Sequence, residues 1–230
     1  MKLSIIIPVF NEEKTIKEVL EKIRNVKLEK KEIIIVNDAS KDNTYEFLYN
    51  IKGISSNENI KAINHDKNRG KGAAVRTGLK YVTGDYVIIQ DADLEYNPDD
   101  YLKLLDKIQT EKVSAVFGSR FLGVCENMAF LNYIANQVLL FLTNFLYGSS
   151  LTDACSCYKL FDTNVIKNIE LECDGFEFCH EVTAKLLKLN HRIIEVPIWY
   201  SARTVKEGKK VNWKQLFISA SCLIKYRIKR

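Results

Sequence analysis

The chain has 230 residues, of which 47% are hydrophobic and 27% are charged. Such a chain forms one large globular domain with at most a short appendage, and its composition excludes a repeat or low-complexity protein. The net charge of +5 is uneven. Residues 203–230 hold nine Lys or Arg and one acid, Glu207, which gives this segment +8 and leaves −3 for the first 202 residues.

In the first half of the chain, apolar strands alternate with amphipathic helices. Strands are predicted over residues 3–9, 32–36, 60–64, 86–90 and 113–117, and helices over 12–28, 42–49, 70–81 and 98–109. Asn11 is expected to cap the first helix, with Glu12 and Glu13 favourably placed in its first turn. This order predicts an α/β fold around a mostly parallel central sheet.

The second half is less regular. Residues 126–147 are very apolar, but Asn132, Asn136 and Asn144 fall at multiples of four and share one helical face. We interpret this stretch as an amphipathic helix on the surface of the protein or of a membrane; a transmembrane span and a buried core helix are the alternatives. A strand over 158–161, a helix over 177–189, a strand over 192–196 and a helix from residue 212 complete the prediction.

The basic segment is predicted to be an amphipathic extension, residues 203–230, of one domain over residues 1–202, because no linker divides the chain. Its charges alternate with apolar side chains, which suits an anionic membrane surface. The apolar side chains are Trp213, Leu216, Phe217, Leu223, Ile224 and Tyr226. We expect no nucleic-acid partner, because no known binding motif accompanies the charge.

The six cysteines include no Cys-x-x-Cys pair, and Cys155-Ser156-Cys157 has the wrong spacing for a zinc knuckle. The first residues run directly into a strand and do not resemble a signal peptide. We therefore expect reduced, packed thiols and a cytoplasmic protein.

Two carboxylates follow the apolar strand over residues 86–90, in the tripeptide Asp91-Ala92-Asp93. Residues two apart on a strand point to the same side, and parallel strands bind ligands at their carboxyl ends. Unpaired carboxylates are costly in a partly dry cleft, and a hard cation such as Mg²⁺ or Mn²⁺ offsets that cost. The sequence thus suggests a metal site at Asp91 and Asp93; a solvated turn is the alternative.

Seven segments resemble, in order, the motifs of the family-two glycosyltransferases, especially the branch that makes polyprenyl-phosphate sugars. They are IPVFNEE at 7–13, VNDASKD at 36–42, NRGKGAAVRTG at 68–78, DAD at 91–93, TDACSCYKLF at 152–161, GFEF at 175–178 and EVPIWYSAR at 195–203. The resemblance implies the GT-A fold, a Rossmann-like α/β sandwich for nucleotide-sugar transfer.

The resemblance also implies a nucleoside-diphosphate sugar as donor, UDP- or GDP-linked, and a metal ion that stabilises the departing diphosphate. In this interpretation Asp93 binds the metal, and Asp91 binds the metal or the ribose. The residues implied in nucleotide binding are Pro8, Phe10, Asn11, Glu12, Asp38, Gly70, Lys71, Asp91, Arg203 and Lys209.

Several of these residues have structural alternatives. Asp38 would accept a hydrogen bond from the base, or form an Asp turn. Gly70 and Gly72 would form a phosphate-binding turn at a helix N-terminus, or allow a helix to pack closely on a strand. Lys71 would approach the nucleotide. Arg203 and Lys209 would lie in a loop that closes over the donor. The alternative for Lys206, Lys209 and Lys210 is a solvated charge run.

Four residues are expected to be catalytic: Asp91, Asp93, Asp153 and Arg120. By resemblance, Arg120 contacts a phosphate through its planar donor fork. Asp153 orients the acceptor or acts as a base, which a hydroxyl acceptor requires and an anionic phosphate does not.

The resulting hypothesis is an inverting, metal-dependent glycosyltransferase that acts on a polyprenyl (dolichyl or undecaprenyl) phosphate or another membrane-associated acceptor. We expect it to be peripheral at the cytoplasmic face of a membrane, or held there by a membrane-anchored partner. The alternatives are transfer to a saccharide or protein hydroxyl, a sugar-phosphate nucleotidyltransferase, and a non-catalytic nucleotide-sugar-binding module.

Overall fold

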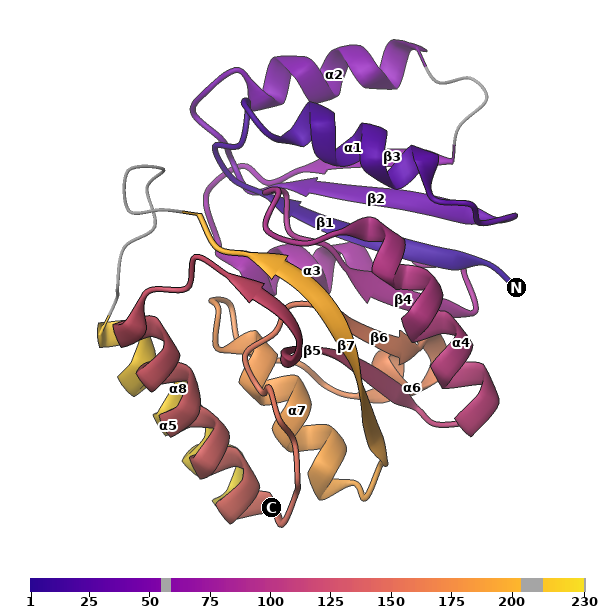
Figure 1. The fold of residues 1–230 in the computed structure, drawn as a ribbon. Coiled ribbons are helices and arrows are strands. Elements are labelled where there is room, and N and C mark those ends of the chain that lie inside the picture. Colours follow the sequence, from indigo (N-terminus) through magenta and orange to yellow (C-terminus); the bar gives the residue numbers. More distant parts are fainter. Residues whose placement is uncertain (55–58, 204–212, 230) are drawn as a thin grey trace.

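A computed structural model describes residues 1–54, 59–203 and 213–229, without the side chains of residues 51–54. One seven-stranded sheet, in the order β3-β2-β1-β4-β6-β5-β7, runs through it (Figure 1). The strands are β1 (Leu3–Val9), β2 (Lys31–Asn37), β3 (Ile60–Asn64), β4 (Tyr86–Ile89), β5 (Ala115–Glu126), β6 (Lys159–Asp162) and β7 (Ile193–Ser201).

The helices are α1 (Ile16–Asn25), α2 (Thr44–Ile54), α3 (Lys71–Leu79), α4 (Tyr101–Glu111), α5 (Phe130–Tyr147), α6 (Thr163–Asn168), α7 (Phe178–Lys188) and α8 (Trp213–Ile228), with a short 3₁₀ turn at Pro98–Asp100. Strands β1, β2, β3 and β4 pair in parallel, as do β5 and β7, whereas β6 is antiparallel to both of its neighbours. The predicted α/β class with a mostly parallel sheet is therefore confirmed.

Side chains of β1 alternate between two apolar cores because successive residues of a strand face opposite sides of the sheet. Ile5 and Ile7 pack with α1 and α4, whereas Ile6 packs with α3 and α7 on the other face. Helices cover both faces, so the central strands are buried on both sides, which explains their continuous apolar sequences.

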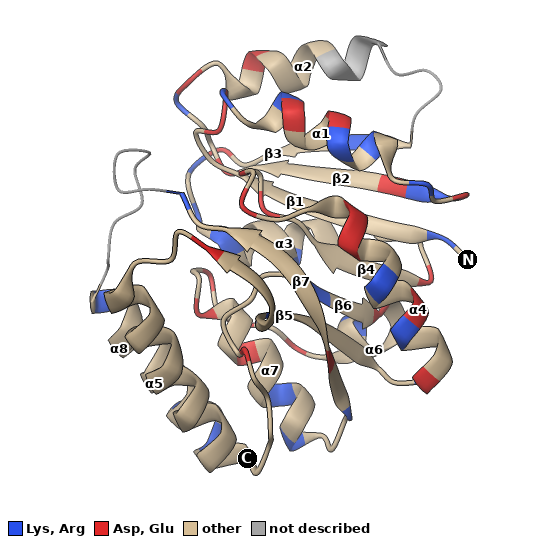
Figure 2. Ribbon diagram, in the orientation of Figure 1, with Lys and Arg blue, Asp and Glu red and all other residues tan. Residues whose placement is uncertain are grey.

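Helices α5 and α8 lie side by side and pack against α7 (Figure 1). A separate apolar cluster joins the three helices, and the Tyr147 hydroxyl donates to the carbonyl of Leu223 at 2.7 Å. Helix α5 carries no charged residue (Figure 2). Only Leu139 and Thr143 of α5 are buried, so the core-helix alternative is wrong. Among the described helices, none combines the length and apolarity that crossing a bilayer requires.

The predicted N-cap at Asn11 is wrong, because α1 begins only at Ile16. Asn11 has a left-handed backbone (φ 56°), and its side-chain oxygen accepts the Lys41 N–H at 2.8 Å. This bond to a nearby turn takes the place of the expected capping bond, because short amide side chains readily bond to backbone groups in turns.

The strand predicted over 113–117 continues as β5 to Glu126, so the following helix starts at Phe130 rather than at residue 126. The extension pairs with β7 across an irregular register. Gly123 permits the close approach, because a Cβ there would lie 2.1 Å from the Ile198 carbonyl oxygen. The short helix α6 was not predicted, since six residues carry little periodicity.

We predict that Glu32→Gln destabilises the fold at neutral pH. The Glu32 carboxylate accepts bonds from Lys2, Ser4 and Thr83. Burial raises its pKa, but these bonds outweigh burial and lower the pKa to about 2. The carboxylate therefore stabilises the fold at pH values above the ordinary pKa of a glutamate, and this stabilisation is lost as the pH falls towards 2.

Urea unfolding at pH 7 should show a loss of about 2 kcal/mol for Glu32→Gln, since each bond to a charged group contributes about that much. The loss should shrink as the pH is lowered from 5. The exposed Glu21→Gln serves as the control. Equal stability of Glu32→Gln and wild type at pH 7 would refute this account of β2.

Candidate active site

A cleft of about 380 Å³ lies at the carboxyl ends of β1, β2 and β4. Here the strand order reverses, because β2 and β3 extend to one side of β1 and β4 lies on the other. Open α/β sheets bind ligands at such a point. The cleft brings together nine of the predicted residues: Pro8, Phe10, Glu12, Asp38, Gly70, Lys71, Asp91, Asp93 and Arg203.

One predicted nucleotide-binding residue within the described part of the chain, Asn11, is not among those that line this cleft. Asn11 is exposed and is tied to the neighbouring turn, where its N–H donates to the Ser40 hydroxyl at 3.0 Å. Lys209 lies outside the described residues.

Asp91 follows the end of β4 and forms a partly buried ion pair with Lys71, the first residue of α3. Lys71 also contacts the Cys157 sulfur at 2.9 Å. Burial alone would raise the pKa of Asp91, but the charge of Lys71 outweighs burial and lowers it. Asp91 is thus held as a carboxylate by a cation that lies within the protein.

Asp93 pairs with Arg203, whose Nη2 lies 2.8 Å from Oδ2 of the carboxylate. The same guanidinium lies 3.1 Å from Glu12 and 3.8 Å from Glu95. Burial and the charges of Asp91 and Glu95 raise the pKa of Asp93 to about 7, although Arg203 opposes them. One guanidinium therefore serves three carboxylates.

This arrangement fits a divalent metal. Asp91 and Asp93 offer hard oxygen ligands in one cleft, which Mg²⁺ and Mn²⁺ prefer, and a cationic group already lies beside Asp93. Within the described residues, no three His, Cys, Asp or Glu side chains converge as a metal cage. The two aspartates thus suit an ion that also takes oxygen ligands from a bound phosphate.

Asp38, at the end of β2, holds the turn that leads into α3. One carboxylate oxygen accepts from His65 Nδ1 at 2.7 Å and from the Arg69 N–H at 2.9 Å, and the other accepts from the Gly70 N–H at 2.7 Å. Gly70 has φ 97°, and a Cβ there would lie 2.4 Å from the Asp174 carbonyl oxygen. Only glycine fits this turn. Because the Asp38 carboxylate holds the turn through the Arg69 and Gly70 N–H groups, Asp38 has a structural role in addition to any contact with a base.

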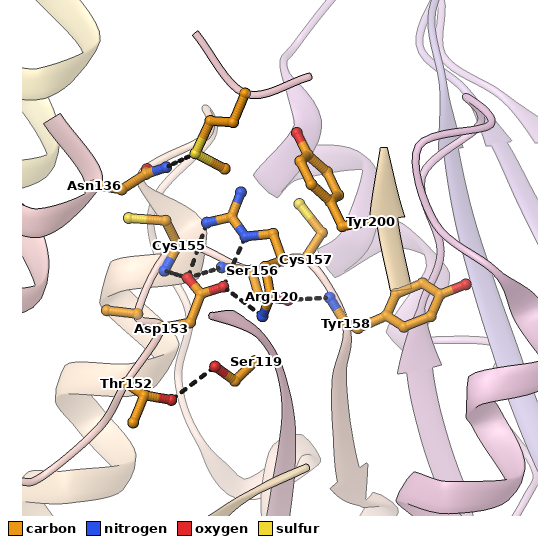
Figure 3. Close-up of polar contacts among 12 residues, drawn as sticks. Ser119, Arg120, Asn136, Thr152, Asp153, Cys155, Ser156, Cys157, Tyr158 and Tyr200 are labelled. Carbon is orange, nitrogen blue, oxygen red and sulfur yellow. Dashed lines mark hydrogen bonds and ion pairs between the residues drawn. The ribbon is translucent and has the colours of Figure 1, made fainter. Parts of the chain in front are cut away.

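Arg120 and Asp153 form a second, fully buried ion pair (Figure 3). Arg120 Nε lies 2.7 Å and Nη2 lies 2.8 Å from the carboxylate. Backbone N–H groups of Arg120, Cys155 and Ser156 bring the hydrogen bonds on Asp153 to five. Burial would raise the pKa of Asp153, but the charge and bonds of Arg120 outweigh it and lower the pKa.

Arg120 borders a second cavity, of about 290 Å³, between α5, α7 and α8. Asn132 and Asn136 of α5 line it, so the polar face of this helix points into the protein. Phe176 lines both cavities, which therefore adjoin. His180 also lines the second cavity, and burial lowers its pKa to about 3.

Sequence reasoning missed three residues that position the site. Glu95 accepts bonds from the Tyr200 hydroxyl and from the Arg203 N–H. Glu195 accepts from the N–H groups of Thr152 and Asp153. His65 bridges Asp38 and Thr77. Glu95 continues the spacing of Asp91 and Asp93, and that signal could have found it.

The family model of glycosyl transferase family 2 matches residues 4–170. The chain belongs to this family. It is 37% identical over 226 residues to a UDP-N-acetylglucosamine–dolichyl-phosphate N-acetylglucosaminyltransferase of Methanococcus voltae, covering 90% of this chain and 89% of the relative. It is 29% identical over 215 residues to a dolichol-phosphate mannosyltransferase of Pyrococcus furiosus, covering 91% of this chain and 59% of that relative.

Solved structures show that this glycosyltransferase has the GT-A fold. Glucosyl-3-phosphoglycerate synthase of Mycobacterium tuberculosis, in complex with Mn²⁺, UDP-glucose and phosphoglyceric acid, superposes with a TM-score of 0.71 at 17% identity, covering 98% of this chain and 79% of that one. TarS of S. aureus, in complex with UDP-GlcNAc, superposes with a TM-score of 0.66 at 18% identity, covering 98% of this chain and 67% of that one.

We predict that Asp153→Asn destabilises the glycosyltransferase by about 3–5 kcal/mol, because it leaves the buried Arg120 charge without its partner. The double variant Arg120→Gln/Asp153→Asn should recover part of this loss. Chemical unfolding of the two single variants and the double variant measures both effects. Strictly additive losses would show that the pair is not coupled.

Proposed function

We propose that this glycosyltransferase transfers one sugar from a nucleoside-diphosphate sugar to a polyprenyl phosphate, such as a dolichyl or undecaprenyl phosphate, at a membrane surface. The observation that carries the proposal is the pair of adjoining cavities with Arg120–Asp153 beside them. The names of the M. voltae and P. furiosus relatives support a dolichyl-phosphate acceptor.

The donor belongs in the cleft at Asp91 and Asp93. These carboxylates would hold Mg²⁺ or Mn²⁺, which supplies positive charge to the leaving diphosphate. The turn at Gly70 presents the N-terminus of α3 to the cleft, which favours phosphate oxygens there. The complexes of the mycobacterial synthase with Mn²⁺ and UDP-glucose support this assignment.

The acceptor belongs in the second cavity, and Asp153 is poorly suited to deprotonate it. Its carboxylate already accepts five hydrogen bonds and has a lowered pKa. His180, with a pKa of about 3, is a weak base. A phosphate monoester is already anionic at neutral pH and needs no base.

Arg120 provides the charge that would bind such a phosphate. Two of its five N–H donors serve Asp153, which fixes the guanidinium and leaves the fork able to bind a further anion. A phosphate oxygen of the acceptor would attack the anomeric carbon as the bond from that carbon to the donor diphosphate breaks. The nucleoside diphosphate departs, and this single in-line displacement inverts the sugar. In this scheme Asp153 orients Arg120.

Helices α5 and α8 would meet the membrane. Because the polar face of α5 points inward, the two helices expose large apolar side chains, which suit an interfacial site. They include Phe130, Leu131, Ile134, Val138, Phe141, Phe145, Phe217, Ile218, Ile224 and Ile228. Lys225 and Lys229 of the basic segment pair with Glu172, so apolar contact contributes more than these two charges.

This surface would place the lipid chain of the acceptor beside the second cavity, since α5 and α8 form two of its walls. The protein would then act as a peripheral protein at the cytoplasmic face. A membrane-anchored partner on the same surface would give the same location.

We predict that Asp93→Asn lowers transfer by about 100-fold or more, because the variant loses a metal ligand at the diphosphate. Transfer is measured from UDP- and GDP-sugars to a polyprenyl phosphate with Mn²⁺ present. The exposed Asp99→Asn, six residues further on, should retain activity. Unchanged turnover in Asp93→Asn would reject the role of Asp93, and transfer only to soluble sugars would reject the acceptor.

We also predict that Phe141→Glu/Phe145→Glu weakens binding to phosphatidylcholine–phosphatidylglycerol vesicles by about tenfold or more, because two stacked, exposed phenylalanines are lost. Tyr45→Glu/Tyr49→Glu is the matched control: it changes a stacked, exposed pair at the same spacing on α2. Vesicle co-sedimentation measures both. Equal effects of the two variants would contradict the assignment of this surface.

A further inference from the structure

Arg203 is held in place by its backbone while its side chain remains accessible. It follows β7, and its N–H donates to Glu95 Oε1 at 2.8 Å. Glu95 is itself fixed, since its other oxygen accepts the Tyr200 hydroxyl at 2.9 Å and its carbonyl accepts the Ser201 N–H at 2.9 Å. The Arg203 side chain is 36% exposed, so the guanidinium can turn away from Asp93 without movement of the strand.

The other cation beside the two aspartates differs from Arg203. The Lys71 side chain is 9% exposed, and its ammonium bridges Asp91 and the Cys157 sulfur. Withdrawing Lys71 would break both contacts of a nearly buried ammonium and remove the counterion of Asp91, which is costly. Arg203 is therefore the cation of the two that can be exchanged at low cost.

The Arg203 guanidinium lies where the surrounding carboxylates would attract a divalent cation most strongly. It contacts Asp93 at 2.8 Å and Glu12 at 3.1 Å, so it neutralises carboxylates that a metal at Asp93 would neutralise instead. A metal and a guanidinium repel each other at such short range. The two cations therefore compete for Asp93.

We propose that Arg203 is a positioning residue that couples metal binding to donor binding. In the free enzyme its guanidinium occupies Asp93 and weakens binding of the metal. When a nucleoside diphosphate binds, the guanidinium moves to the phosphate oxygens and Asp93 becomes available to the metal. This inference rests on the metal-dependent reaction proposed above. Because coupling is reciprocal, each ligand strengthens the other.

Direct Mn²⁺ binding tests the exchange without an activity assay. The full chain is titrated with Mn²⁺ at pH 8, with and without UDP, and free Mn²⁺ is followed by its electron paramagnetic resonance signal. In wild type, UDP should tighten Mn²⁺ binding by about tenfold or more. Arg203→Gln should bind Mn²⁺ alone about five- to tenfold more tightly than wild type, and UDP should then tighten it less.

Two variants control for charge and folding. Arg203→Lys keeps the positive charge and should retain most of the coupling. Arg192→Gln removes an exposed arginine that pairs with Glu111 outside the cleft, and it should behave as wild type. Thermal unfolding establishes that each variant is folded.

Two results would overturn the proposal. If folded Arg203→Gln binds Mn²⁺ alone no more tightly than wild type, while wild type binds Mn²⁺ with UDP, the exchange is wrong and metal dependence stands. If wild type binds no Mn²⁺ even with UDP and transfers sugar without metal, the metal dependence itself fails, and the exchange fails with it.

Discussion

Two carboxylates lie in a cleft where burial makes negative charge costly, and the arrangement of this cleft follows from how they are neutralised. Asp91 is paired with Lys71 from inside the protein, and Asp93 with Arg203 from the end of β7. The Lys71 side chain of the first pair is 9% exposed, whereas the Arg203 side chain of the second is 36% exposed. The site thus keeps one permanent and one exchangeable positive charge beside the acid pair.

The fold brings these charges together from distant parts of the chain. Parallel pairing places the ends of β1 and β4 side by side, so Glu12 and Asp93 approach each other. The long β5–β7 pair carries Arg203 to the same edge and Arg120 to the neighbouring cavity. A sheet of local βα units thereby gives rise to two adjoining sites, one rich in acids and one containing a neutralised ion pair.

The Arg120–Asp153 pair determines what the second site can do. A carboxylate that accepts five hydrogen bonds is a firm anchor for a guanidinium and a poor proton acceptor. An acceptor that arrives already ionised suits such a site. Helix α5 supports the same interpretation, since its Asn132 and Asn136 line this cavity while its phenylalanines are exposed.

Much of the fold was predictable because strands such as β1 and β2 are continuous apolar runs bounded by turn residues. The grouping of Asp38, Asp91 and Asp93 in one cleft was also predictable, since these residues follow strand ends that parallel pairing must bring together. The limits of β5 and α5 were not, because the pairing of residues 124–126 with β7 is a long-range contact without local periodicity. The direction of the α5 polar face was missed for the same reason: a helical stripe does not say which side the protein covers.

Anomalous diffraction from crystals grown with MnCl₂ and UDP tests the central claim most directly. The account predicts a manganese peak within ligand distance of the Asp93 carboxylate and of the diphosphate oxygens, with the Arg203 guanidinium moved from Asp93 to the phosphates. Bound UDP with no manganese peak at Asp91 and Asp93, and with the Asp93–Arg203 pair intact, would contradict it.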